Sequence, residues 1–182
     1  ITLDNGHIDT RYVYSAGTVR GNGTISCRTR MYNGGVISPG FEGVAGCITV
    51  SNALTDSYRQ YFDGQYNLSR SGTLDVDLGG ITAQTDYDVL AVIGNVALVS
   101  GANHGIFTVR LMNGFKPQDG DTFDVLTATG TITPADLANV VFTMPAAPRT
   151  TWSQAVVAIP GGQALRLTAH VAPPDGTLLL IR

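Results

Sequence analysis

Charged side chains are scarce in this sequence, since Asp, Glu, Lys and Arg together make up only 14% of its 182 residues. Lys and Glu, two good helix formers, are especially rare. The polar residues are mostly Thr, Asn, Ser and Asp, and 22 residues are Gly, a mixture that favours strands and turns over helices. The composition therefore indicates an all-β protein.

A basic stripe and long apolar runs are missing as well. The 11 Lys and Arg residues are outnumbered by 14 Asp and Glu residues, which gives a net charge of −3 at pH 7. A protein that binds DNA or RNA needs clustered positive charge to neutralise phosphates. No apolar run approaches the roughly 20 residues that span a bilayer. We therefore expect neither a nucleic-acid partner nor a transmembrane segment.

Metal ligands and catalytic motifs are equally sparse. The two cysteines, Cys27 and Cys47, have no third cysteine or histidine at metal-ligand spacing, and His7, His104 and His170 are scattered. The sequence contains no Gly-x-Ser-x-Gly elbow, no phosphate loop and no dinucleotide fingerprint. We therefore predict no metal, no cofactor and no enzymatic activity.

An internal repeat is the strongest positive signal. Residues 73–78 alternate apolar side chains with Asp, and residues 106–111 repeat the arrangement 33 positions later. The Tyr-Asp-Val-Leu of residues 87–90 is likewise matched by the Phe-Asp-Val-Leu of residues 123–126. Repeats that cannot bury their apolar face alone are typical of solenoids and arrays, although hairpins in a sandwich also produce them.

These patterns predict a parallel β-helix, or β-solenoid, over residues 1–140. Residues 141–182 are expected to add antiparallel strands that close or cap the same unit. A short helix is predicted over residues 133–139, with Thr133 as its N-cap and Pro134 at its first position. The structural alternative is a Greek-key β-sandwich.

The spacing of the two cysteines fits this solenoid. Cys27 and Cys47 lie 20 residues apart, and one coil of a solenoid takes about 20 to 25 residues. Equivalent positions on adjacent coils lie about 4.8 Å apart, within reach of a disulfide. We therefore predict a Cys27–Cys47 disulfide, with two free buried thiols as the alternative.

A series of turn and strand motifs carries a family resemblance. Gly-Gly-Val-Ile-Ser-Pro-Gly at residues 34–40 precedes Gly-Cys-Ile-Thr-Val at residues 46–50, and Leu-Asp-Val-Asp-Leu-Gly-Gly at residues 74–80 precedes the Tyr-Asp-Val-Leu segment. Over roughly residues 20–132 this series resembles the passenger-associated repeats of bacterial autotransporter adhesins and related secreted surface proteins. The chain departs from the family by inserting residues 55–70.

The resemblance implies a parallel β-helix in a bacterial protein that is extracellular or at the cell surface. The first residue, Ile1, fits a mature protein trimmed of a signal peptide, and equally a segment of a longer chain. We expect a non-catalytic structural protein or adhesin, whose exposed strand rows associate with identical copies into filaments. The alternative partner is a surface glycan or protein, bound by a module of a larger surface protein.

Pairs of carboxylates suggest a second functional class. Asp75 and Asp77 are about 7 Å apart on one strand face, a separation that suits sugar cleavage. They make a polysaccharide lyase or tailspike-like module the alternative hypothesis, with Tyr66 as a further candidate. Outward Asp residues also keep a sheet face soluble and blunt its edges, and Asp-rich turns bind Ca²⁺ in some proteins.

The inserted segment carries an aromatic cluster. Tyr58, Arg59, Tyr61, Phe62 and Tyr66 lie within nine residues, and aromatic rings beside Arg are typical of recognition surfaces. We therefore predict a binding site there. An apolar segment that caps the end of the solenoid explains the same residues.

Overall fold

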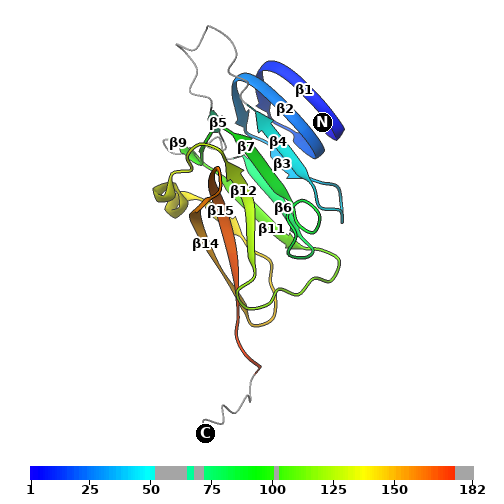
Figure 1. The fold of residues 1–182 in the computed structure, drawn as a ribbon, viewed down its shortest axis with the longest axis vertical. Coiled ribbons are helices and arrows are strands. Elements are labelled where there is room, and N and C mark those ends of the chain that lie inside the picture. Colours follow the sequence, from blue (N-terminus) through cyan, green and yellow to red (C-terminus); the bar gives the residue numbers. More distant parts are fainter. Residues whose placement is uncertain (52–64, 68–71, 101–102, 175–182) are drawn as a thin grey trace.

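The described residues form one large curled β-sheet, a separate two-stranded sheet and one short helix (Figure 1). The structure is a computed structural model that describes residues 1–51, 65–67, 72–100 and 103–174. Its strands and its 3₁₀ helix are β1 (Thr2–Ser15), β2 (Thr18–Asn33), β3 (Val36–Pro39), β4 (Cys47–Ser51), β5 (Gln65–Asn67), β6 (Thr73–Leu78), β7 (Val89–Ile93), β8 (Asn95–Ala97), β9 (Val99–Ser100), β10 (Asn103–His104), β11 (Ile106–Leu111), β12 (Thr122–Ala128), η2 (Pro134–Asn139), β13 (Val141–Thr143), β14 (Thr150–Ile159) and β15 (Gly162–Val171).

The alternation of residue types decides which side chains enter the core. In β6, Leu74, Val76 and Leu78 are fully buried, while Asp75 and Asp77 between them face outward and are only partly covered. Successive side chains of a strand point to opposite faces, so this pattern places every second residue inside. The buried side chains of the parallel strands together form one continuous hydrophobic core.

The internal repeat determines how two pairs of strands lie next to each other. β6 pairs with β11 in parallel, with Leu74 opposite Phe107 and Val76 opposite Val109. β7 pairs with β12 in the same sense, with Leu90 opposite Leu126. Both registers match the repeat offsets in the sequence, so equivalent residues of the two copies are neighbours in the sheet.

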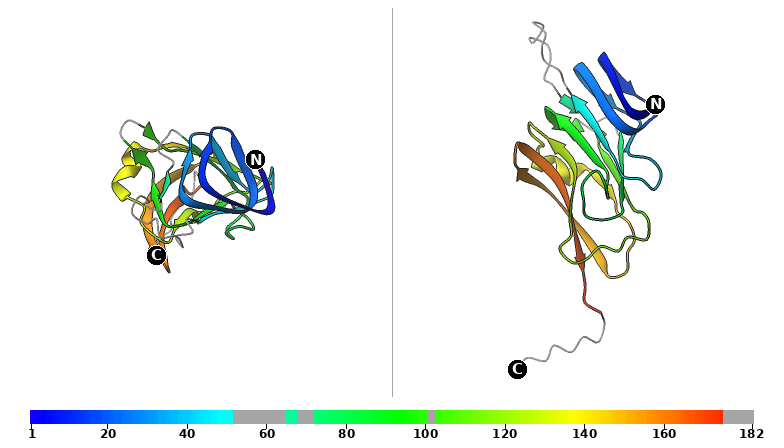
Figure 2. Two further views of the ribbon diagram at one scale, coloured as in Figure 1. Left: turned by 90° about the horizontal axis from the view of Figure 1, so that it is seen from above. Right: turned by 45° about the vertical axis from the view of Figure 1, so that its right-hand side comes forward.

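The prediction of a parallel β-helix is nevertheless wrong. Thirteen strands form one mixed, mostly parallel sheet that curls into a half-barrel. Ten of them follow the order β13-β11-β6-β3-β2-β4-β7-β12-β15-β14, while β1 and β5 pair with β2 outside this order and β8 pairs with β5. The Greek-key sandwich is wrong as well, because 13 of the described strands belong to one mostly parallel sheet and only β9 and β10 form a separate pair. Figure 2 shows from above how the N-terminal strands curl round (blue).

Long strand β2 explains why separate solenoid faces do not form. It pairs with β3 near its start, with β4 in its middle and with β5 near its end, in addition to β1. Strands from different parts of the chain therefore join one sheet through β2. The spacing between paired strands also varies, from 25 residues between β2 and β4 to 42 between β4 and β7, whereas a regular coil needs a constant period.

The C-terminal part is antiparallel. β14 and β15 form a hairpin around Pro160 and Gly161, and β15 pairs antiparallel with β12. The helix predicted after Thr133 is present as η2, a 3₁₀ helix with Thr133 at its N-cap and Pro134 in its first turn. The hairpin extends the sheet beyond its parallel part (Figure 2).

The predicted disulfide is also wrong, since both cysteines are free. Gly23 of β2 lies opposite Ile48 of β4, so residues 25 positions apart are neighbours and residues 20 apart are not. Cys27 instead lies opposite Thr10 of β1. The backbone N–H of Cys47 donates a hydrogen bond of 2.7 Å to the side chain of Asn22. Cys47 therefore lies near the middle of β2, next to the Gly23–Ile48 pair, whereas Cys27 is four residues further along β2 than Gly23. The two thiols are not neighbours in the sheet.

Candidate functional site

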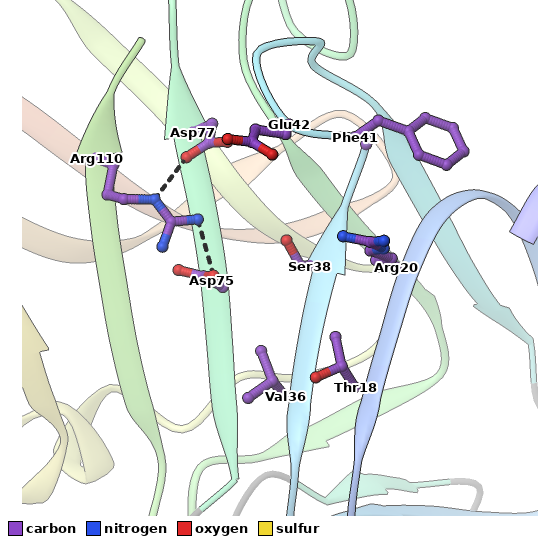
Figure 3. A pocket seen from close by; sticks show the side chains of 10 residues that line it. Thr18, Arg20, Val36, Ser38, Phe41, Glu42, Asp75, Asp77 and Arg110 are labelled. Atoms are coloured by element: carbon purple, nitrogen blue, oxygen red, sulfur yellow. Dashed lines mark hydrogen bonds and ion pairs between the residues drawn. The ribbon is translucent and has the colours of Figure 1, made fainter. Parts of the chain in front are cut away.

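A polar groove crosses the outer face of β2, β3, β6 and β11, and we call it the Arg110 groove (Figure 3). Its volume is about 440 Å³, within the range of small-molecule sites. The residues that line it are Thr18, Arg20, Val36, Ser38, Gly40, Phe41, Glu42, Asp75, Asp77 and Arg110.

Parallel pairing brings these side chains to one face. Arg20 of β2 lies opposite Ser38 of β3, and Asp77 of β6 lies opposite Arg110 of β11. Because neighbouring strands are about 4.8 Å apart and paired residues share a face, the four strands present their polar side chains in rows. Glu42 comes from the loop that follows β3 and lies at the rim of the groove.

Arg110 joins the two aspartates of β6. Its Nη2 lies 2.8 Å from Oδ2 of Asp75, and its Nε lies 3.0 Å from Oδ1 of Asp77. Partial burial of the guanidinium disfavours its charged form and, taken alone, lowers the pKa of Arg110. The hydrogen bonds and charges of Asp75 and Asp77 outweigh that effect and raise the pKa of Arg110 above its ordinary value. The second oxygen of Asp75, Oδ1, is buried and has no hydrogen-bond partner among the described residues.

This arrangement bears on the proposed sugar-cleaving pair. Asp75 and Asp77 lie in one groove, as the hypothesis requires. Cleavage needs one carboxyl as acid and the other as base or nucleophile, placed on either side of the scissile bond. Here both carboxylates are on one strand and share one guanidinium. The geometry favours holding a ligand over cleaving it.

A buried carboxyl group, that of Asp88, lies next to the groove and fixes its end. Asp88 is 1% exposed, and its Oδ1 accepts a hydrogen bond of 2.8 Å from the N–H of Gly46. Its Oδ2 accepts one of 3.0 Å from the N–H of Asp77. The side chain therefore ties β6 to the end of the loop that carries Glu42.

The pKa of Asp88 is raised to about 7. Burial is the largest cause, because it removes the carboxylate from water, and the nearby charges of Asp77 and Asp75 act in the same direction. The two backbone hydrogen bonds, which favour the ionised form, offset only part of the rise. In the sequence Asp88 is one of several closely spaced carboxylates, with Asp86 two positions before it, and no separate role was predicted for it, although its place in Tyr-Asp-Val-Leu marks it as a polar residue in an apolar run.

The second copy of the repeat uses its aspartate differently. Asp124, which stands where Asp88 stands in the first copy, forms two hydrogen bonds with Arg166 of β15, of 2.7 and 2.8 Å. The first copy therefore uses its carboxylate inside the sheet, and the second uses it to attach the C-terminal hairpin.

The predicted aromatic site lies mostly outside the described residues. Tyr58, Arg59, Tyr61 and Phe62 belong to residues 52–64, which the structure does not describe. Tyr66 is in β5, where its backbone is paired with β2 and β8. Binding at this cluster stays a prediction.

The described residues offer few other candidate sites. They contain no group of three or more His, Cys, Asp or Glu side chains that could hold a metal ion. No helix among these residues is long and apolar enough to cross a membrane. Burial, with a smaller contribution from the charge of Asp9, raises the pKa of the Cys27 thiol to about 12, so this cysteine is a poor nucleophile.

The sequence matches no protein-family model, and no curated protein matches it.

Proposed function

We propose that this chain is a non-catalytic structural or adhesive protein of the cell surface that associates with copies of itself. The observation that carries the proposal is the open edge of the sheet at β14. The cell-surface location rests on the resemblance of the repeats to those of secreted surface proteins. The paired carboxylates of the Arg110 groove, held by one guanidinium, support a role without catalysis.

β14 has the properties of an edge that pairs with another chain. It is ten residues long and, among the described strands, pairs only with β15. Its sequence, Thr-Thr-Trp-Ser-Gln-Ala-Val-Val-Ala-Ile, contains no charged residue and no proline. Monomeric proteins usually protect such edges with Lys, Pro or a bulge. None of these three protections is present along β14, and among the described elements the short helix η2 packs against part of it.

The partner that fits this edge is a second copy of the same chain. Two β14 strands related by a two-fold axis pair antiparallel without bringing like charges together. The other edge strands differ from β14. β13, at the opposite end of the sheet order, is only three residues long, and β1, which pairs with β2, carries Asp4, His7 and Asp9. Self-association through β14 therefore produces dimers first, and any growth into filaments needs one of these less suitable edges.

A substitution at Ala155 tests this proposal. Ala155 is exposed near the middle of β14 and lies opposite Arg166 of β15. In A155E the new carboxylate has an attractive cross-strand neighbour within its own chain, but two copies of it meet near the two-fold axis of a β14 pair. A155Q is the matched control, because it has nearly the same size without the charge.

The measurement is light scattering after size-exclusion chromatography over a concentration series, with negative-stain electron microscopy of the largest species. We expect the wild type and A155Q to form dimers or larger species, and A155E to stay monomeric with an unchanged melting temperature. Self-association through β14 is refuted by a wild type that stays monomeric at every concentration, or by an A155E variant that assembles as the wild type does.

A further inference from the structure

The Arg110 groove offers unused hydrogen-bonding groups around a fixed pair of carboxylates. Arg20, Ser38 and Glu42 line it, and none of the three has a side-chain hydrogen bond or ion pair within the described ranges. Asp75 and Asp77 add carboxylates that Arg110 already holds. Polar side chains without a partner in the protein can bond a ligand without first breaking a hydrogen bond of the fold.

The charges of the groove indicate the class of ligand. Two arginines face three carboxylates, so positive and negative groups nearly balance. Such a balance attracts neither a polyanion nor a polycation, whereas donors and acceptors in alternation suit a ligand that both donates and accepts hydrogen bonds. Sugar hydroxyls do both. Thr18 and Val36, paired at the near end of the groove, add apolar surface for the C–H face of a sugar ring (Figure 3).

The arrangement in rows indicates the shape of the ligand. Arg20, Ser38 and the aspartates of β6 project from successive strands towards the same space, and Arg110 closes the row on β11 (Figure 3). A chain molecule that lies across the strands therefore meets a new polar group at each strand, about every 4.8 Å. Because Arg110 holds Asp75 and Asp77 in place, these acceptors need little reorganisation on binding.

We infer that the Arg110 groove is a binding site for a neutral oligosaccharide. The groove lies on the parallel strands and β14 lies at the antiparallel end of the sheet order, so this site does not depend on self-association. It gives the protein a means of adhesion that the open edge alone does not supply.

The experiment is an array of neutral glycans, acidic glycans and peptides, probed with the wild-type protein, followed by calorimetry with the best neutral oligosaccharide. We expect binding to neutral glycans. R20Q and S38A are expected to weaken it, R20Q at least about tenfold, because a hydrogen bond from a charged donor is lost. R149Q, at an exposed arginine outside the groove, is the control and should bind as the wild type does.

Melting temperatures of all three variants show whether the fold is kept. The inference is overturned if no neutral glycan is retained on the array, or if R20Q and S38A bind as tightly as R149Q. Retention of peptides or acidic glycans alone also overturns it, because the groove would then select a different class of ligand.

Discussion

Replacing Asp88 with Asn should change how the stability of the protein depends on pH. The carboxyl group of Asp88 is almost fully buried, and each of its oxygens accepts a hydrogen bond from a backbone N–H, one from Gly46 and one from Asp77. Its pKa in the folded state is about 7, against an ordinary value of 3.8. Folding is therefore linked to the ionisation of this one side chain.

The direction in which stability changes with pH follows from the raised pKa of Asp88. Below pH 4 the group is protonated in both the folded and the unfolded state, so it imposes no penalty. Between pH 4 and pH 7 the unfolded chain ionises first, and the free energy of unfolding falls. Above pH 7 both states are ionised and the loss is complete, at about 4 kcal/mol for a pKa that moves from 3.8 to about 7.

The asparagine introduced by D88N cannot ionise, so the variant lacks this loss. Its amide nitrogen replaces one acceptor oxygen and faces a backbone N–H, which costs about 1–3 kcal/mol at every pH. D88N should therefore be less stable than the wild type at pH 4 and more stable at pH 8, and the two stability curves should cross between these values.

Urea unfolding from pH 4 to pH 8 measures this effect. The fluorescence of Trp152 reports unfolding, because it is the only tryptophan and its ring lies 6.0 Å from that of Phe123 in the folded state. D136N, in the first turn of η2, serves as the control and should follow the wild type. A difference between D88N and the wild type that stays constant, or that grows in favour of the wild type as the pH rises, would refute the reasoning.

Two further predictions concern the core and the thiols. F107A should lower the free energy of unfolding by about 3–5 kcal/mol, because Phe107 is fully buried and its ring stacks on that of Phe142 at 5.1 Å; a loss below about 1 kcal/mol in urea would contradict this packing. A thiol reagent at pH 8 should leave Cys27 unmodified in the folded protein and should titrate two free thiols after unfolding, because both cysteines are free and the pKa of Cys27 is about 12. Fewer than two thiols in the unfolded, unreduced protein would indicate a disulfide.

Local pattern was enough to predict β6 and β11 and most of the side chains that they bury. The alternation in residues 73–78 and 106–111 is reproduced by the burial of β6 and β11, and the repeat offset gives their register. Such features depend only on residues close together in the sequence and on the two-residue period of a strand. The short helix after Thr133 was predictable for the same reason.

The register between distant strands was not predictable from the same pattern. The predicted disulfide assumed a coil of 20 residues, whereas β2 and β4 pair at an offset of 25. Insertions between strands change that offset without changing the alternation inside any strand, so the sequence offers no measure of it. The predicted solenoid failed for a related reason, because a long strand such as β2 can pair with several others and merge their ladders into one sheet.

The chemistry of the Arg110 groove was predictable only in part. Asp75 and Asp77 stood out as a pair of carboxylates, but their role depends on Arg110, which is 33 residues beyond Asp77 and reaches them only because β6 and β11 pair in register. The repeat that predicts this pairing therefore also predicts the contact. Arg110 stands where the first copy has Asp77, so opposite charges at equivalent positions of two paired repeats are expected to meet across the strands. Applied to Asp88 and Asp124, the same comparison identifies equivalent aspartates but not their partners, which come from elsewhere in the chain: Gly46 and Asp77 for one, Arg166 for the other.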